Sequence, residues 1–149
     1  MEKKDILDKL RHAKSAHIKW RAYAQALVSG LPVEKEQVPV IYTDCAFGKW
    51  YYGAGQSLSS LSSFDAISLP HESIHHIYIK IFKLLFGKDE RSKLAKLFSS
   101  ENIIKTANKK KANILLHELI SISGTLLEAI MALENEIKDM SQEEISALF

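Results

Sequence analysis

The chain has 149 residues and a formal net charge of +2; 46% of its residues are hydrophobic and 26% are charged. This balance predicts one soluble globular domain over residues 1–149 and argues against a nucleic-acid partner or an anionic membrane surface. The single cysteine excludes an internal disulfide and fits a reducing compartment. A charged N-terminus and the absence of about 18 uninterrupted apolar residues predict a cytoplasmic protein without a membrane span.

A long helix is predicted over residues 2–29, because apolar side chains recur there at alternating spacings of four and three. Gly30 and Pro32 supply its stop signals. His17 is the unusual member of this apolar seam, because its position predicts an imidazole that faces the core. The members of the seam are Ile6, Leu10, Ala13, His17, Trp20, Ala24 and Leu27.

The segment TDCAFGKWYYG, residues 43–53, contains the only cysteine, Cys45, in aromatic surroundings. Residues 31–43 have no helical period and predict a loop. We expect a short helix over residues 44–53, capped by Thr43 or Asp44 and ended by Gly53 and Gly55. The Ser-rich run QSLSSLSS that follows predicts a connection within the same domain.

A second long helix is predicted to begin between Asp65 and Pro70 and to run to about Phe86, with Gly87 as its stop. Some alternation in IHHIYIKIFKLLF would also suit a strand, but the length and the lack of a partner strand favour a helix. The predicted seam is Ile67, His71, Ile74, His75, Tyr78, Phe82 and Leu85.

The remaining elements are also predicted to be helical. Residues 88–98 suggest a short helix, and residues 100–140 a third long one with Leu115, Leu119, Ile122, Leu126, Ala129 and Leu133 as its seam. Ser141 and Glu144 match a capping box before a short tail. The sequence therefore predicts an all-α bundle of three long helices and one or two short ones.

The six histidines divide by helix face. His12, His76 and His117 are predicted on solvent-facing sides of their helices. His17 lies on the first seam, and His71 and His75 are four residues apart, one turn above each other on the second seam.

Three inward histidines allow two interpretations. Each could have its own buried hydrogen bonds, since an unpaired buried polar group costs about 1–3 kcal/mol. Alternatively, one metal ion could bind all three together with Cys45, which is the ligand composition of a tetrahedral zinc site. The spacing of His17, Cys45, His71 and His75 is long-range, so no short motif decides between them.

Three sequence blocks resemble the chemoreceptor zinc-binding domain family. AHIKW at 16–20, CAFGKWYYG at 45–53 and HESIH at 71–75 follow the family's order, and the resemblance covers roughly residues 10–86. It implies zinc ligands at His17, Cys45, His71 and His75, one Zn²⁺ per chain and a cytoplasmic helical bundle that is commonly a homodimer. It also implies regulation of a bacterial chemoreceptor signalling domain or a diguanylate cyclase in response to zinc or to oxidation of the bound cysteine.

Such domains are usually fused to an output module, and neither a receptor signalling hairpin nor a cyclase is found in these 149 residues. We therefore expect a stand-alone member or an excised domain.

If the four residues bind zinc, Gly48 permits a close approach of the backbone or of a ring, and Phe47 and Trp50 either line the site or simply pack the core. The alternative function is a structural module that zinc staples together. An enzyme is not expected, because four protein ligands would leave no open position on the metal.

Overall fold

The computed structural model describes the chain except for residues 33, 35–36, 88–94, 96 and 98–99, and every element in the described part is helical. The long helices are α1 (Lys3–Val28), α3 (Ser68–Phe86) and α5 (Glu101–Asp139). The short ones are α2 (Ala46–Tyr51), α6 (Gln142–Ser146) and the 3₁₀ turns η2 (Ala54–Leu58) and η3 (Asp65–Ile67). The predicted all-α class is confirmed, whereas the short helix predicted over residues 88–98 falls largely outside the described residues.

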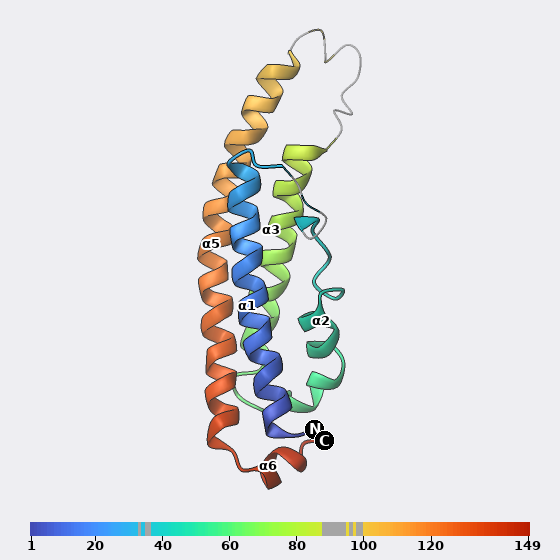
Figure 1. Cartoon of the computed structure of the whole chain (residues 1–149), viewed down its shortest axis with the longest axis vertical. Helices are drawn as coiled ribbons and strands as arrows, with labels where there is room; N and C mark the ends of the chain where they lie inside the picture. The colour runs from blue at the N-terminus through green and yellow to red at the C-terminus, as the bar shows by residue number, and fades with distance from the viewer. Residues whose placement is uncertain (33, 35–36, 88–94, 96, 98–99) are drawn as a thin grey trace.

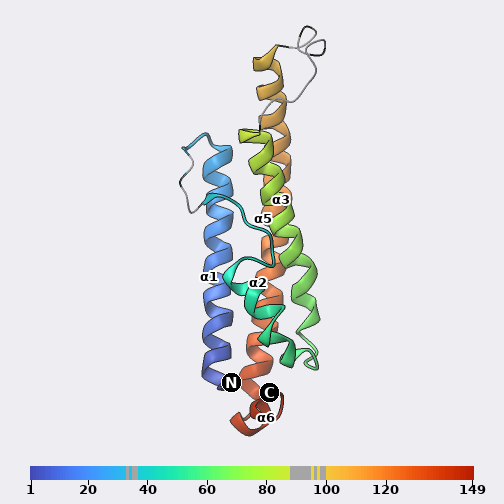
Figure 2. The same ribbon diagram turned by 90° about the vertical axis from the view of Figure 1, so that its right-hand side faces the viewer.

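The three long helices run side by side, with α5 packed against both α1 and α3 (Figures 1 and 2). Figure 2 shows α2 beside α1, at the opening between α1 and α3. The first turns of α5 extend past the ends of the other two long helices (Figure 1). The short helix α2 thus occupies the side of the α1–α3 pair that α5 leaves uncovered.

The core follows the predicted seams closely. Most of the predicted seam residues are buried, and the remainder, such as Trp20 and Phe82, are partly buried against the core. His17 is 3% exposed, and His71 and His75 are 0% exposed. The three inward histidines therefore lie in the hydrophobic core, where each imidazole needs a specific partner.

The helix ends use the predicted signals at α6 and α3, and the cap of α5, at Ser100, was not predicted. Ser141 and Glu144 form the expected capping box at α6, and the Gly87 N–H donates to the Lys83 carbonyl at the end of α3. Ser100 caps α5, its hydroxyl accepting from the Ile103 N–H. These local bonds satisfy backbone groups that a helix end leaves without partners.

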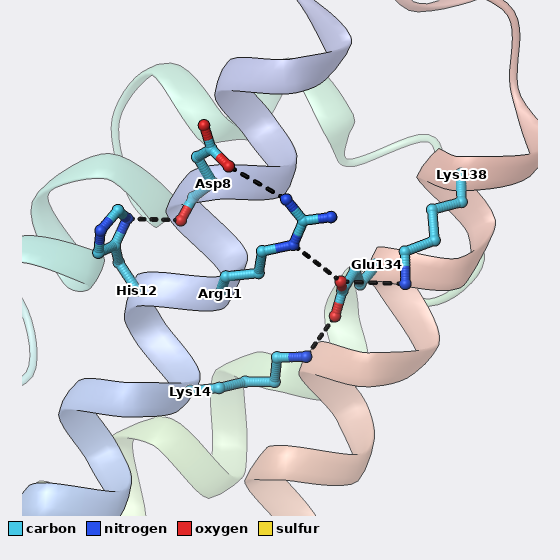
Figure 3. Close-up of polar contacts among 6 residues, drawn as sticks. All are labelled: Asp8, Arg11, His12, Lys14, Glu134 and Lys138. Atoms are coloured by element: carbon cyan, nitrogen blue, oxygen red, sulfur yellow. Dashed lines mark hydrogen bonds and ion pairs between the residues drawn. The ribbon is translucent and has the colours of Figure 1, made fainter.

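A nearly buried carboxylate holds α1 against α5 (Figure 3). The side chain of Glu134 is 5% exposed and contacts Lys14 and Arg11 of α1 and Lys138 of its own helix, the last two at 3.4 and 3.0 Å. The hydrogen bond from Lys14, supported by Lys138, holds the pKa of Glu134 at about 2, although burial opposes this. The contact fixes the register of the helix that carries His17.

Among the described helices, α5 is long and apolar enough to cross a membrane by length and composition alone. Core helices that are mostly buried pass the same test, but only 22% of the apolar window of α5 is buried, although the helix contributes Leu119, Leu126, Ile130 and Leu133 to the core. The face of α5 turned away from α1 and α3 leaves some large apolar side chains exposed, among them Ile114 and Met131.

Candidate metal centre

Four side chains from distant parts of the chain meet between the helices. His17 comes from α1, Cys45 from the residue before α2, and His71 and His75 from successive turns of α3. One ligand atom from each lies within 4.8 Å of those of all the others. The structure therefore brings together all four residues that the sequence singled out, and their role as zinc ligands remains a prediction.

Two of the imidazoles are oriented by backbone carbonyl groups. The Nδ1 of His17 lies 2.7 Å from the Ala13 carbonyl oxygen, and that of His75 lies 2.7 Å from the Val40 carbonyl oxygen. Because a carbonyl only accepts, Nδ1 must carry the proton, and the lone pair is then on Nε2. Metal-binding histidines are commonly oriented in this way.

The Nε2 of His75 shows why a ligand is needed here. This atom is buried and has no hydrogen-bond partner among the residues that the structure describes. Since Nδ1 is the donor, Nε2 is an acceptor held in the core without a donor, which is a costly arrangement in a folded protein. A cation bound by the four side chains would satisfy it.

Cys45 is both a member of the cluster and the cap of α2. Its Sγ accepts a hydrogen bond from the Gly48 N–H at 3.1 Å and lies 3.4 Å from Nε2 of His71. The prediction that Thr43 or Asp44 caps this helix was wrong: both belong to a preceding turn, in which the Asp44 N–H donates to the Ile41 carbonyl. The helix therefore begins one residue later than an Asp44 cap required and two later than a Thr43 cap required, and the sulfur takes the capping position.

Gly48 is required by a close backbone approach, as the sequence suggested. A Cβ at this position would lie 1.8 Å from the Tyr42 carbonyl oxygen. That same carbonyl lies 3.5 Å from the Sγ of Cys45. The turn that presents the sulfur is therefore packed directly against Gly48.

Gly48→Ala is expected to destabilise the protein by about 1–3 kcal/mol, as overpacking does elsewhere. Because the Tyr42–Cys45 turn must move, zinc affinity is also expected to fall roughly 10–100-fold, the effect typical of disturbing a ligand's support. Urea unfolding and competitive chelator titration measure the two effects. Gly124→Ala is the control, because nothing lies within 4 Å of its added Cβ. Equal stability and equal zinc affinity of the Gly48→Ala and Gly124→Ala variants would contradict this account.

Aromatic rings enclose the cluster. Trp20 lies against His75, with ring centroids 4.4 Å apart, and Phe47 meets His71 edge-on at 5.1 Å. Among the ring contacts of the described residues, Trp50 meets Phe47, at 5.8 Å, and not a histidine of the cluster, so of these two residues Phe47 is the one in direct contact with the cluster. Tyr52 stacks on His71 at 6.0 Å. Trp20 is already a member of the predicted seam and of the AHIKW block, whereas nothing in the sequence marks the Val40 carbonyl.

The electrostatics of the cluster favour neutral imidazoles. Burial, followed by the neighbouring histidines, lowers the pKa of His71 to about 2. Burial also lowers the pKa of His75, to about 4, against the opposing Val40 hydrogen bond, and lowers that of His17. Burial raises the pKa of the Cys45 thiol, so a cation is needed to hold it as thiolate.

Acid is expected to destabilise the metal-free protein from about pH 6.5 downward. An unfolded histidine gains its proton near pH 6.5, whereas folded His75 does so near pH 4 and folded His71 near pH 2. Between these pH values the unfolded state binds more protons than the folded state. The free energy of unfolding therefore decreases as the pH is lowered, by roughly 2 kcal/mol at pH 5 for each of these two histidines. Urea unfolding at pH 7 and pH 5 measures this loss.

Two features keep that pH measurement specific. Glu134, with a pKa of about 2, stays ionised throughout this range and adds little to the change. His117 is exposed on α5 and is not among the groups that shift the pKa of His71 or His75, so His117→Gln should show the same loss of stability as the unaltered chain. A stability that stays constant between pH 7 and pH 5 would contradict buried, neutral imidazoles.

The donor set fits zinc. Tetrahedral zinc with bonds of about 2.0–2.1 Å to nitrogen and about 2.3 Å to sulfur places its ligand atoms about 3.3–3.6 Å apart. The Cys45–His71 pair already lies at 3.4 Å, and the whole cluster within 4.8 Å needs only small inward movements. Three imidazole nitrogens and one sulfur are also the ligand types that zinc accepts.

Comparisons with known proteins agree with this geometry. The model of the chemoreceptor zinc-binding domain family matches residues 17–82, a range that begins at His17 and includes the other three cluster residues. No curated protein and no solved structure matches the chain. The match covers α2, the cluster and most of α3, so residues 17–82 are similar to the chemoreceptor zinc-binding domain.

Proposed function

We propose that this chain is a cytoplasmic zinc-dependent regulatory domain that responds to zinc availability or to oxidation of Cys45. The observation that carries the proposal is the convergence of one thiol and three neutral imidazoles inside an otherwise apolar core. By analogy with the family, its output would be bacterial chemotaxis or cyclic-di-GMP signalling.

His17, His71 and His75 would hold zinc through nitrogen, and Cys45 through sulfur. A bound zinc ion supplies the positive charge that keeps the sulfur as thiolate at neutral pH. The Gly48 N–H already points at Sγ and adds to the stabilisation of a negative sulfur. Four protein donors fill a tetrahedral shell, so a non-catalytic role is proposed.

A thiolate is also the form of cysteine that oxidants attack. With hypochlorous acid the balanced step is RS⁻ + HOCl → RSOH + Cl⁻, in which sulfur loses two electrons and chlorine gains them. The sulfenic acid no longer offers the soft anionic donor, and thiols reverse the change. Cys45 is partly exposed while the three histidines are buried, so Cys45 is the most exposed member of the cluster.

Loss of the Cys45 ligand would act on α2 first. This helix has six residues, too few to be stable alone, and its N-terminus is tied to α3 through the Cys45–His71 contact. Release of that tie would free α2 relative to the long helices, which remain joined by their own core. A local change of this kind is the form that many ligand switches take.

A second candidate is a structural module that zinc only staples together. A buried site with four protein ligands is typical of structural zinc, and this favours the alternative. In that case zinc would leave only when the whole bundle unfolds. The two functions therefore differ in the order of metal loss and unfolding.

The test treats zinc-loaded protein with one equivalent of hypochlorous acid and follows zinc release with a chromogenic chelator. A sensor should release zinc while the circular dichroism of the long helices persists, and dithiothreitol should restore binding. Met131→Leu with Met140→Leu is the control for oxidation elsewhere, because it keeps Cys45 and removes the two internal methionines. Retention of zinc until global unfolding would support the staple.

We also propose a homodimer as the form in which the domain acts. The exposed apolar residues Ile114 and Met131, with the partly exposed Ile120 and Leu127 along the same helix, support a contact through α5. The partner in signalling would be a chemoreceptor signalling domain or a diguanylate cyclase. Sedimentation equilibrium tests the dimer, and Met131→Glu should shift it toward monomer.

A further inference from the structure

A cavity of about 610 Å³ opens beside the metal centre, between α1 and α2. Its volume lies in the range of pockets that bind small organic molecules and is far larger than one hydrated ion needs. Three members of the cluster, His17, Cys45 and His75, form part of its lining. None of the features described so far explains a space of this size on this side of the domain.

The body of the cavity is apolar. Trp20, Val40, Phe47 and Trp50 contribute its large side chains. On α1, the small side chain of Ala16 leaves room between the rings, and this position is exposed. Both tryptophans of the chain line the space, so a flat aromatic or branched apolar group could lie against them.

The rim of the cavity is cationic. Lys9 and Lys19 line it from exposed positions of α1, with His12 between them in sequence, and none of the described residues that line the cavity is acidic. Asp8, the nearest carboxylate along the helix, is paired with Arg11 at 3.2 Å. Figure 3 shows His12 pointing away from Glu134 and its cation cluster. The charge facing a bound molecule is therefore positive.

We propose that this cavity binds a small organic anion with an aromatic or branched apolar body and one carboxylate or sulfonate. The apolar body would pack against Trp20 and Trp50, and the anionic group would lie at the mouth near Lys9 or Lys19, which are about 15 Å apart along α1. The proposal uses only the residues of the cavity and does not depend on zinc. It is nevertheless relevant to the metal centre, because a molecule bound here lies against Cys45.

The test uses two probes of nearly the same body. The first is 8-anilinonaphthalene-1-sulfonate, and the second is N-phenyl-1-naphthylamine, which lacks the sulfonate. We titrate each into the chain as purified, with its zinc content measured in parallel, and follow probe emission and tryptophan quenching. The proposal predicts one site per chain and at least about 3–10-fold tighter binding of the sulfonate, the effect expected of two exposed cations. Equal affinity for the two probes would overturn the anion assignment.

Paired variants locate the site. Ala16→Leu places a larger side chain in the cavity from an exposed helix position and should weaken sulfonate binding about 5–10-fold. Its control is Ala22→Leu, an exposed position of the same helix that does not line the cavity. Lys9→Gln with Lys19→Gln should remove the preference for the sulfonate, whereas Lys4→Gln with Lys80→Gln should retain it.

Each variant set has a result that would overturn the proposal. Equal binding by the two leucine variants would place the probe elsewhere. If the sulfonate probe bound only after a dimer had been diluted to monomers, a second copy of the chain would cover the cavity, and the proposal of a small-molecule site would be overturned. Unchanged helical circular dichroism in every variant keeps a loss of binding distinct from a loss of fold, and the zinc content of each variant keeps this test separate from the metal assignment.

Discussion

Cys45→Ser is expected to lower zinc affinity by more than about 100-fold. Disturbing a residue that only supports a metal ligand commonly costs 10–100-fold, and this substitution removes a proposed ligand itself. Serine keeps a small polar group at the α2 cap, so the Gly48 N–H retains an acceptor and the helix can still form. Competition with a chelator of known affinity measures the change on folded protein.

The matched control for this substitution is His76→Ala. His76 follows His75 directly, but it is exposed and outside the cluster, so its removal should leave zinc affinity within about 2-fold. Its contact with Glu72, at 3.9 Å between exposed side chains, adds little. Equal zinc retention by Cys45→Ser and His76→Ala would show that Cys45 is not a ligand.

Removing zinc is expected to lower the melting temperature by about 8–16 °C. Free zinc at 1,000 times its dissociation constant stabilises the folded state by about 4 kcal/mol, and for a chain near 150 residues each kcal/mol corresponds to about 2–4 °C. The long helices keep their own core, so the metal-free protein should remain folded at room temperature. Differential scanning calorimetry with and without zinc measures the shift.

The loss of protection on zinc removal should also be local. Hydrogen exchange at the amides of α2 is expected to accelerate at least about 10-fold, because this short helix loses the ligand at its N-terminus. Amides near Leu126 and Leu133 of α5, which lie in the core away from the cluster, should change little. Uniform acceleration over all helices would contradict a switch at α2 and support a zinc-stapled bundle.

The fold could be predicted from the sequence because its long helices carry regular apolar seams. The spacing of Ile6, Leu10 and Ala13 on α1 gives both the helix and its buried face, and the same holds for α3 and α5. His17, His71 and His75 could be selected for the same reason, since they occupy seam positions where a polar group needs a partner.

The details that complete the site could not be predicted, because they depend on loop backbone. The Val40 carbonyl that orients His75 lies in a segment without periodicity, and the sulfur cap of α2 replaced the conventional polar caps expected at Thr43 or Asp44. The cavity beside the cluster also depends on how α2 sits against α1. Such placements are set by tertiary packing rather than by local pattern.

X-ray absorption at the zinc edge tests the central claim most directly. Zinc-loaded protein is predicted to show one sulfur neighbour at about 2.3 Å and three nitrogen neighbours at about 2.0–2.1 Å, and Cys45→Ser should lose the sulfur signal. A spectrum of the unaltered chain with only nitrogen and oxygen neighbours would contradict the assignment of Cys45, His17, His71 and His75 as one zinc site.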